Sequence, residues 1–207
     1  MIESAFRQIY RYVWETPEPR WVPDMVYHDD TFIVSYPKSG NTWVRFLIGN
    51  YFTDNECTFD NCHQITPDLH MNPEYCNEIE RPRFIKSHSP FEPAYSNVIY
   101  IVRDGRDVAV SYYHHSLRKG HIEPEANFAE FLEMFNQGEV GNFGIWSEHV
   151  TSWLNQDEVP TLLVRYEDLL EDAQQELVRI LEFSGVKIEI DRVKSAVEAS
   201  KFENMRE

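Results

Sequence analysis

The chain has 207 residues, of which 42% are hydrophobic and 14% aromatic, a composition typical of a globular domain with a substantial core. Its formal net charge of −16 excludes general binding to nucleic acid or to an anionic membrane. Three cysteines are too few for a disulfide framework, and no apolar run is long enough to span a bilayer or follows Met1 as a signal peptide. We therefore expect a cytoplasmic protein without membrane insertion.

The first expected elements are an amphipathic helix, a strand and a second helix. Residues 2–14 mix apolar and charged positions as a helix does, and they belong to an N-terminal lead-in of residues 1–30. The β-rich run Thr31–Val34 predicts a buried strand, and helical spacing of apolar residues predicts a helix from about Gly40 to residue 52. Residues 54–82 are polar and contain prolines, which predicts an irregular, lid-like connection.

The rest of the chain alternates strands with helices. Strands are expected at 83–86, 97–102 and 161–164, and helices at 108–118, 128–136, 143–156, 171–183 and 191–200. The run 97–102 is almost wholly apolar, as a central strand of a parallel sheet is. This order predicts a three-layer α/β fold, with a central parallel sheet flanked by helices, in a single domain over residues 1–207.

The turn after the first strand has the features of an anion site. Residues 35–43 read SYPKSGNTW, and a strand that enters a tight turn and opens a helix leaves N–H groups unpaired at a positive helix end. Lys38 adds a charge, and Ser39 and Thr42 add hydroxyl donors. Gly40 allows the backbone to approach a ligand closely. The segment lacks the G-x-x-x-x-G-K-[ST] pattern of nucleoside-triphosphate sites.

Four predicted strand ends carry residues that bind or react. In chain order they are Lys38, then Lys86 with His88, then Arg103, and then Arg165 with Tyr166. In an open parallel sheet, ligands bind in the crevice beyond the carboxyl ends of the strands. We therefore expect these side chains to converge on one crevice.

Three segments resemble the sulfotransferases that use 3′-phosphoadenosine 5′-phosphosulfate (PAPS). Tyr36–Trp43 resembles their 5′-phosphosulfate loop, Val98–Tyr113 is similar to their 3′-phosphate segment, and Phe84–Pro90 resembles their Lys-Thr-His-x-Pro segment. The resemblance covers most of residues 31–207 and implies a P-loop-like nucleotide-binding fold. It also implies transfer of the sulfuryl group from PAPS to a hydroxyl of a small molecule, with adenosine 3′,5′-bisphosphate (PAP) as the product and no metal.

The resemblance further implies roles for individual residues. His88 matches the general base, and Lys38 and Lys86 match lysines near the reacting groups. Arg103 and Ser111 match the contacts to the 3′-phosphate. The residues that match donor contacts are Lys38, Ser39, Gly40, Asn41, Thr42, Trp43, Arg103, Ser111, Tyr166, Ser200 and Phe202.

Two other functions are compatible with the sequence: a P-loop kinase that phosphorylates a small molecule from ATP, and a nucleotide-binding module without turnover. In the family, a later Arg-Lys-Gly…Gly-x-Trp segment closes over the 3′-phosphate, and residues 1–207 contain no counterpart. Either the sequence is truncated, or it belongs to an abbreviated member.

The acceptor and a metal site are less sharply indicated. Five aromatic residues are expected either to line a pocket for a phenol or another small hydroxyl compound, or to belong to the core: Phe91, Tyr95, Tyr112, Tyr113 and Phe143.

Cys57, Cys62, His63 and Cys76 include the residue types of a zinc site. Their spacing is not that of a paired knuckle, so we expect no metal.

Overall fold

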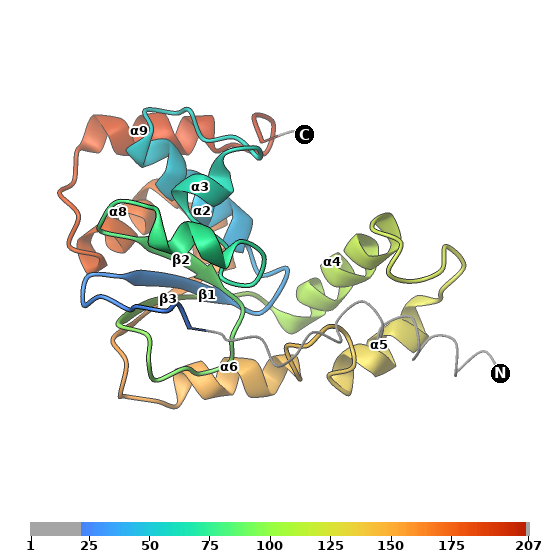
Figure 1. The fold of residues 1–207 in the computed structure, drawn as a ribbon. Coiled ribbons are helices and arrows are strands. Elements are labelled where there is room, and N and C mark those ends of the chain that lie inside the picture. The colour runs from blue at the N-terminus through green and yellow to red at the C-terminus, as the bar shows by residue number, and fades with distance from the viewer. Residues whose placement is uncertain (1–21, 206–207) are drawn as a thin grey trace.

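The computed structural model describes residues 22–205, so the helix expected at 2–14 lies outside the described residues. Its centre is a sheet of β1 (Thr31–Ser35), β2 (Phe84–Ser87), β3 (Asn97–Val102) and β4 (Thr161–Arg165). The strand order is β2-β1-β3-β4, and every pairing is parallel. The parallel sheet and the central position of β3 confirm the prediction from sequence (Figure 1).

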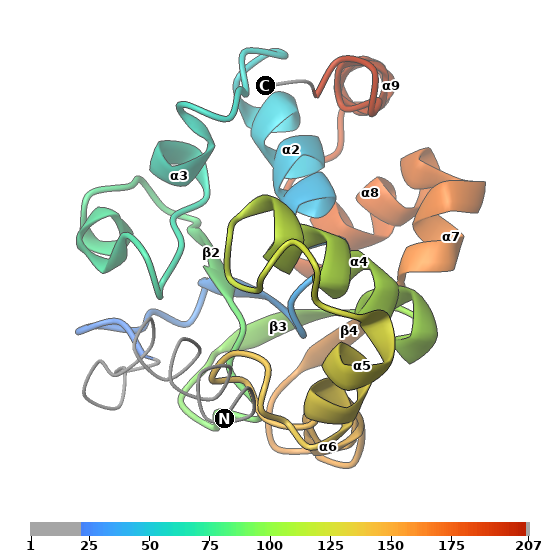
Figure 2. The same ribbon diagram turned by 90° about the vertical axis from the view of Figure 1, so that its right-hand side faces the viewer.

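Helices cover both faces of the sheet. They are α2 (Asn41–Phe52), α3 (Cys62–Ile65), η1 (Pro73–Asn77), α4 (Gly105–Arg118), α5 (Phe128–Asn136), α6 (Trp146–Leu154), α7 (Tyr166–Glu171), α8 (Ala173–Phe183) and α9 (Ile190–Ala199). In Figures 1 and 2, α2, α8 and α9 lie on one face and α6 lies on the other, while α4 and α5 extend beyond one end of the sheet. This is the expected three-layer α/β arrangement.

Both sheet faces are buried, because successive side chains of a strand point to opposite faces. In β1, Ile33 packs in the cluster formed with α2, α8 and α9, whereas Phe32 and Val34 pack in the cluster that contains Trp153 of α6. All three β1 side chains are fully buried. The apolar runs of β1 and β3 therefore place these strands inside the molecule, with their carboxyl ends at the same edge.

Three local differences from the sequence prediction have physical causes. Helix α7 follows β4 directly, where only a strand end was expected; Glu167 and Asp168 in its first turn favour a helix start. The helix expected from residue 143 begins at Trp146, because Gly144 before it has a left-handed φ of 71°. The connection 54–82 is less irregular than expected, since it contains α3 and η1.

The connection 54–82 is attached to the edge of the sheet. Asp68 forms an isolated parallel bridge with Lys86 of β2, and the Lys86 N–H donates to the Pro67 carbonyl at 2.8 Å. From the α2 side, the guanidinium of Arg45 donates to the carbonyl and hydroxyl oxygens of Thr66. These contacts bring residues 66–70 beside the carboxyl end of β2.

Candidate active site

The turn between β1 and α2 presents unpaired polar groups at the carboxyl edge of the sheet. Lys38 and Gly40 have left-handed φ angles of 71° and 105°, and α2 begins directly afterwards. Within residues 22–205, the backbone N–H groups of residues 39–42 have no hydrogen-bond acceptor, and the buried Ser39 hydroxyl has no partner either. Buried donors are normally paired, so this loop is built to receive an external acceptor such as a phosphate oxygen.

Gly40 is required by both the backbone and a neighbour. A Cβ at this position would lie 2.6 Å from Cδ2 of Tyr166, closer than side-chain carbons approach, and the left-handed φ would strain any other residue as well.

The side chain of Asn41, expected to contact the donor, is instead hydrogen-bonded within the protein. Its amide donates to the Ile33 carbonyl at 3.0 Å and to the Ser35 hydroxyl at 3.2 Å. Its two amide hydrogens are therefore used to hold the turn to β1, and of its donors only the backbone N–H is left without an acceptor in the described chain.

Arg103, at the end of β3, lies against the same turn. Its Nη1 donates to the Lys38 carbonyl at 3.4 Å, and its guanidinium carbon lies 4.3 Å from the ring centroid of Tyr166. Its Nη2 is 3.8 Å from the exposed carboxylate of Asp107, and its buried Nε has no partner in the described chain. The two loops that the sequence predicts to bind the two ends of one donor are therefore adjacent.

The ammonium of Lys38 faces a concentration of positive charge. Its pKa is lowered by burial and then by the cations of Arg118, Lys86, Arg103 and Lys119. These residues come from β2, β3 and the two ends of α4 in a chain of net charge −16. Such a cluster, with no carboxylate paired to Lys38 in residues 22–205, favours an anionic ligand.

Aromatic rings lie beside the phosphate-type turn. The ring centroid of Trp43 is 4.8 Å from that of Phe202 and 6.0 Å from that of Tyr166. Trp43 is almost fully buried, whereas Phe202 is 53% exposed. Two of these rings belong to helices α2 and α7 that start at the carboxyl edge, so a flat apolar group bound here would meet aromatic surface next to the anion site.

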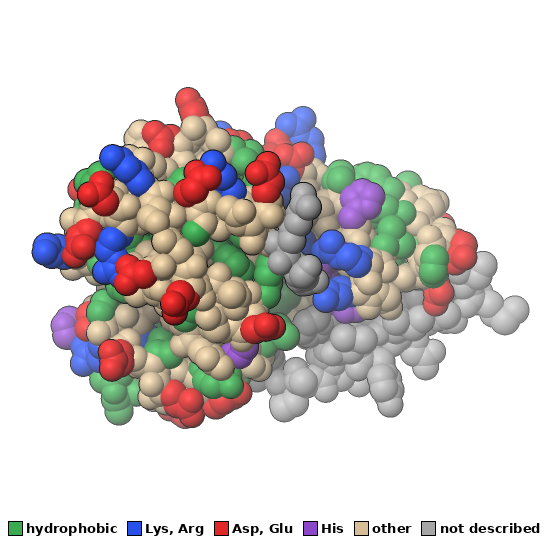
Figure 3. All heavy atoms as spheres, turned by 90° about the horizontal axis from the view of Figure 1, so that it is seen from above, with side chains coloured by type: hydrophobic (Ala, Val, Ile, Leu, Met, Phe, Trp, Pro, Cys, Tyr) green, Lys and Arg blue, Asp and Glu red, His purple; other side chains and the backbone are tan. Residues whose placement is uncertain are grey.

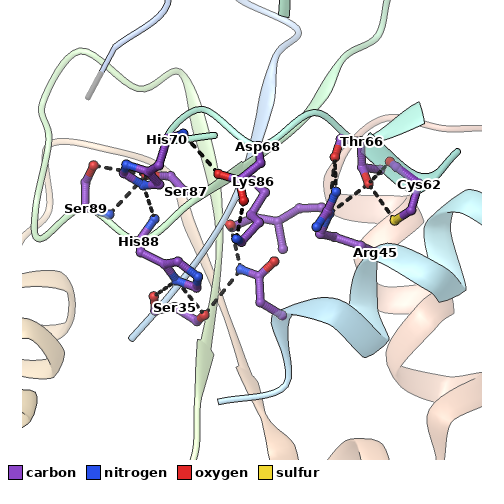
Figure 4. Close-up of polar contacts among 12 residues, drawn as sticks. Ser35, Arg45, Cys62, Thr66, Asp68, His70, Lys86, Ser87, His88 and Ser89 are labelled. Atoms are coloured by element: carbon purple, nitrogen blue, oxygen red, sulfur yellow. Dashed lines mark hydrogen bonds and ion pairs between the residues drawn. The ribbon is translucent and has the colours of Figure 1, made fainter. Parts of the chain in front are cut away.

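The imidazole of His88, which follows β2, is fixed by its surroundings (Figure 4). Its Nδ1 lies 2.7 Å from the Ser35 carbonyl oxygen, which can only accept, so Nδ1 carries the hydrogen and Nε2 keeps its lone pair. The pKa of His88 is well below its usual value of 6.5, because the ring is buried and lies near Lys86 and His70. The ring is therefore neutral at neutral pH.

His70 and Asp68, from the connection 54–82, complete the surroundings of His88 and Lys86. Nε2 of His70 accepts a hydrogen bond from the His88 backbone N–H at 2.7 Å, and the two rings are nearly parallel with centroids 6.0 Å apart. Burial lowers the pKa of His70 to about 3. Asp68 forms an ion pair with the Lys86 ammonium. Burial opposes its ionisation, but the ammonium of Lys86 outweighs this and lowers its pKa.

Residues 28–207 match the family model described as the sulfotransferase domain. The chain belongs to this family. Sulfotransferase 1E1 of Bos taurus is 33% identical over 196 residues, and Sulfotransferase 1E1 of Homo sapiens is 34% identical over 197 residues. Each match covers 86% of this chain and 66% of the relative, so the chain spans about two thirds of the length of these curated sulfotransferases.

Solved structures of other proteins share the fold. The crystal structure of mouse sulfotransferase SULT7A1 complexed with PAP superposes with a TM-score of 0.70 at 28% identity, covering 87% of this chain and 66% of that chain. A retinol dehydratase crystallised with retinol and PAP has a TM-score of 0.70 at 23% identity, covering 97% of this chain and 70% of that chain, and supports the fold alone. The P-loop-like α/β fold expected from the sequence is confirmed.

The sulfotransferase domain does not bring every predicted site residue to the same place. Ser200 is fully buried, and its hydroxyl accepts a hydrogen bond from Asn50 at 2.9 Å, so its side chain joins α9 to α2 and is not open to a purine. Thr42 is exposed beside the turn. Ser111 is half-buried on α4, eight residues after Arg103. The expected purine contact of Ser200 is thus unsupported.

The aromatic residues considered for an acceptor pocket separate into two groups. Tyr95 stacks on Phe32 with ring centroids 3.8 Å apart, and Phe91 packs edge-on against Trp153, so both belong to the core. Phe143 instead meets the rings of His88 and His70 edge-on, at 5.4 Å and 5.8 Å. Of the five aromatic residues, Phe143 is the one whose ring contacts His88 and His70, whereas the rings of Tyr112 and Tyr113 contact His115 and His114 on α4.

Sequence analysis missed His70 and Asp68. They lie in a polar connection without periodicity, and only the pairing of residues 67–69 with Lys86 brings them to the site. The four residues considered as zinc ligands do not form a site in the described chain. The three cysteines are free thiols, and residues 22–205 contain no group of three or more His, Cys, Asp or Glu side chains arranged for a metal.

Among the helices of residues 22–205, none has both the length and the apolar composition needed to span a membrane.

Proposed function

We propose that this domain transfers the sulfuryl group from PAPS to a hydroxyl of a small-molecule acceptor, releasing PAP. The observation that carries the proposal is the contact between Arg103 and the turn of Lys38, which sets two cationic loops side by side at the carboxyl edge. PAPS has two separated anionic ends on one adenosine, and the relative SULT7A1 was crystallised with PAP. The unpaired Ser39 hydroxyl and Arg103 Nε are suited to such a donor.

We assign the donor contacts as follows. The backbone N–H groups of residues 39–42, with the Ser39 and Thr42 hydroxyls, bind the 5′-phosphate, and Lys38 neutralises its charge. Arg103 and Ser111 bind the 3′-phosphate. The adenine lies against the rings of Trp43, Tyr166 and Phe202. In this structure the Phe202 ring packs on Trp43, so Phe202 must move from Trp43 for a purine to lie between them.

The reaction needs a base and neutralisation of the leaving group. The donor supplies a sulfuryl group bonded to a phosphate oxygen. His88 accepts the proton of the acceptor hydroxyl on Nε2, because Nδ1–H is held by the Ser35 carbonyl. Lys38 stabilises the charge that develops on the leaving oxygen as the S–O bond breaks. Lys86, charged and paired with Asp68, lies beside His88 and is assigned to the sulfuryl oxygens.

The donor specificity is tested by thermal shift. We expect PAP to raise the Tm of the protein more than ATP does at equal concentration without magnesium, since only PAP carries a 3′-phosphate for Arg103. Arg103→Ala should remove most of the PAP shift, while Arg106→Ala, which removes an exposed cation in the first turn of α4 that is paired with Asp104, should keep it. Equal stabilisation by ATP with magnesium, unaffected by Arg103→Ala, would favour the kinase alternative.

The base is tested by the pH dependence of sulfate transfer. Because the pKa of His88 is well below 6.5, the acid limb of kcat/KM should lie below pH 6.5, with the neutral, active imidazole present at all higher pH. His88→Ala should reduce kcat by at least about 100-fold while PAP still raises the Tm. PAP binding with no turnover from any acceptor in the wild type would instead favour the nucleotide-binding module.

We place the reaction in the cytoplasm, because the three cysteines are free thiols, as is usual in a reducing compartment.

A further inference from the structure

Tyr36 connects the Lys38 turn to a distant segment of the chain. It follows β1 directly, and its hydroxyl donates to the carbonyl oxygen of Gly144, 108 residues later, at 3.1 Å. The side chain is 1% exposed, and burial raises the pKa of the hydroxyl above its usual value, so the hydroxyl keeps its proton and can donate. The proposed contacts to PAPS do not use this side chain.

Gly144 belongs to a compact loop, residues 138–145, between α5 and α6. A Cβ at Gly138 would lie 3.0 Å from the carbonyl carbon of Gly144, so the two ends of the loop touch. A Cβ at Gly141 would lie 2.7 Å from the Tyr112 hydroxyl oxygen, so the middle of the loop packs on α4. The loop leads from the lobe of α4 and α5, at the right in Figures 1 and 3, back to α6 on the sheet.

This loop carries Phe143 to the proposed base. Phe143 precedes Gly144, and its ring meets the rings of His88 and His70 edge-on, with centroids 5.4 Å and 5.8 Å away. Phe143 is itself buried. A displacement of the Gly144 backbone would therefore also move the aromatic ring that lies against His88.

The ring of Tyr36 makes a second connection to the base. It lies edge-on to the His149 ring, with centroids 5.5 Å apart, and His149 donates to the His88 carbonyl at 3.1 Å. The preceding residue, Ser35, accepts from Nδ1 of His88 through its carbonyl. Residues 35 and 36 thus hold the base through its ring, through the partner of its carbonyl and through the loop of Phe143.

The same two residues lead into the turn that is proposed to bind PAPS. The backbone N–H groups of residues 39–42 have no acceptor in the described chain, so a bound phosphate would pair them and hold the turn in place. Pro37, whose ring fixes its φ, is the single residue between Tyr36 and Lys38, so little backbone freedom separates them. A turn held by a phosphate therefore also holds Tyr36.

We propose that Tyr36 is a positioning residue that couples PAPS binding to the loop 138–145: its hydroxyl holds the Gly144 carbonyl, and thereby the Phe143 ring beside His88, most firmly when the Lys38 turn is occupied. This rests on the proposed sulfotransferase function and adds a link between its two substrates. The wall that Phe143 forms beside the base is then completed when the sulfuryl donor is bound, before the acceptor hydroxyl meets His88.

The test is hydrogen–deuterium exchange of the backbone amides of residues 138–145, with and without saturating PAP. In the wild type we expect PAP to slow this exchange about fivefold, the lower end of coupling between two sites. In Tyr36→Phe the exchange without PAP should be about fivefold faster than in the wild type, as for the loss of one neutral hydrogen bond, and PAP should no longer slow it. PAP should still raise the Tm of this variant, because the proposed phosphate contacts remain.

Tyr113→Phe is the matched control. The Tyr113 hydroxyl also donates to a backbone carbonyl, that of Ala126 at 2.6 Å, and its ring packs against the same cluster as Tyr36. Removing this hydroxyl should speed exchange near residue 126 and leave both the rate and the PAP effect in residues 138–145 as in the wild type. A role of Tyr36 in packing alone would not make its hydroxyl necessary for a response to PAP.

The outcomes separate this inference from the proposed function. If PAP raises the Tm of the wild type but does not slow exchange in the loop, or slows it equally in Tyr36→Phe, the coupling is wrong and the sulfotransferase function stands. Loss of the PAP-induced Tm shift in Tyr36→Phe would place the hydroxyl in the donor site and also overturn the inference. If PAP does not raise the Tm of the wild type, the sulfotransferase function is contradicted and the coupling falls with it.

Discussion

The backbone of His88 is held by two other histidines. Nε2 of His70 accepts from its N–H at 2.7 Å, and Nε2 of His149 lies 3.1 Å from its carbonyl oxygen, so that His149 donates there. The ring itself is held by the Ser35 carbonyl. Because the hydrogen bonds of His70 and His149 to His88 go to its backbone, we regard them as positioning residues: they fix where Nε2 of the base points.

The role of His70 can be separated from simple packing. His70→Leu leaves the buried His88 N–H without an acceptor, at a cost of about 1–3 kcal/mol, and we expect kcat for sulfate transfer to fall about tenfold or more with the KM for PAPS almost unchanged. His70→Gln places an amide oxygen near the former Nε2 and should restore most of kcat. Equal kcat values for the Leu and Gln variants would show that the hydrogen bond does not matter for catalysis.

At the scale of elements, the β1–α2 turn and helix α7 depend on each other. Gly40 takes a left-handed conformation at the start of α2, and the ring of Tyr166, the first residue of α7, covers it so closely that no Cβ fits. The same ring lies beneath the Arg103 guanidinium. The turn, α7 and the end of β3 thus form one packed unit, and disturbing the turn should disturb both predicted phosphate contacts.

Gly40→Ala tests this coupling, with Gly185→Ala as its matched control. Both glycines have left-handed φ angles, 105° and 68°, but a Cβ at Gly185 meets nothing within 4 Å. Each variant should lose about 1–2 kcal/mol of unfolding free energy from the backbone alone. Only Gly40→Ala should also displace Tyr166 and weaken PAP binding, measured by calorimetry. Unchanged PAP affinity in Gly40→Ala would contradict the coupling.

At the scale of the whole molecule, positive charge is concentrated at one edge of an acidic protein. The net charge is −16, yet the cations of Arg118 and Arg103 both help to lower the pKa of Lys38, after the effect of burial. Anions are therefore attracted to this edge while the remaining surface repels them. The arrangement follows from the parallel sheet, since all four strands deliver their following loops to the same side.

Buried neutral histidines should make the fold sensitive to acid. Burial lowers the pKa of His149 to about 4, below the 6.5 of an unfolded chain. Between these values the unfolded state binds more protons, so the unfolding free energy falls as pH decreases, by about 3 kcal/mol for this residue at pH 4. Denaturant titrations from pH 7 to pH 4 should show this slope. It should flatten in His149→Gln and persist in His114→Gln, which changes an exposed histidine; identical slopes would refute the assignment.

Local sequence determined much of this protein. Short apolar runs specified four parallel strands, Asp104 caps α4 by accepting from the Arg106 N–H two residues later, and the SYPKSGNTW segment marked the anion turn, because strand burial, helix capping and turn geometry depend on neighbouring residues. The tertiary structure alone decided which side chains are available. The Asn41 amide is hydrogen-bonded to β1, and the Ser200 side chain is buried against α2. His70 and Asp68 lie beside the base because their segment pairs with β2. Such long-range contacts leave no periodic signal in sequence, since they depend on how separate elements pack in space.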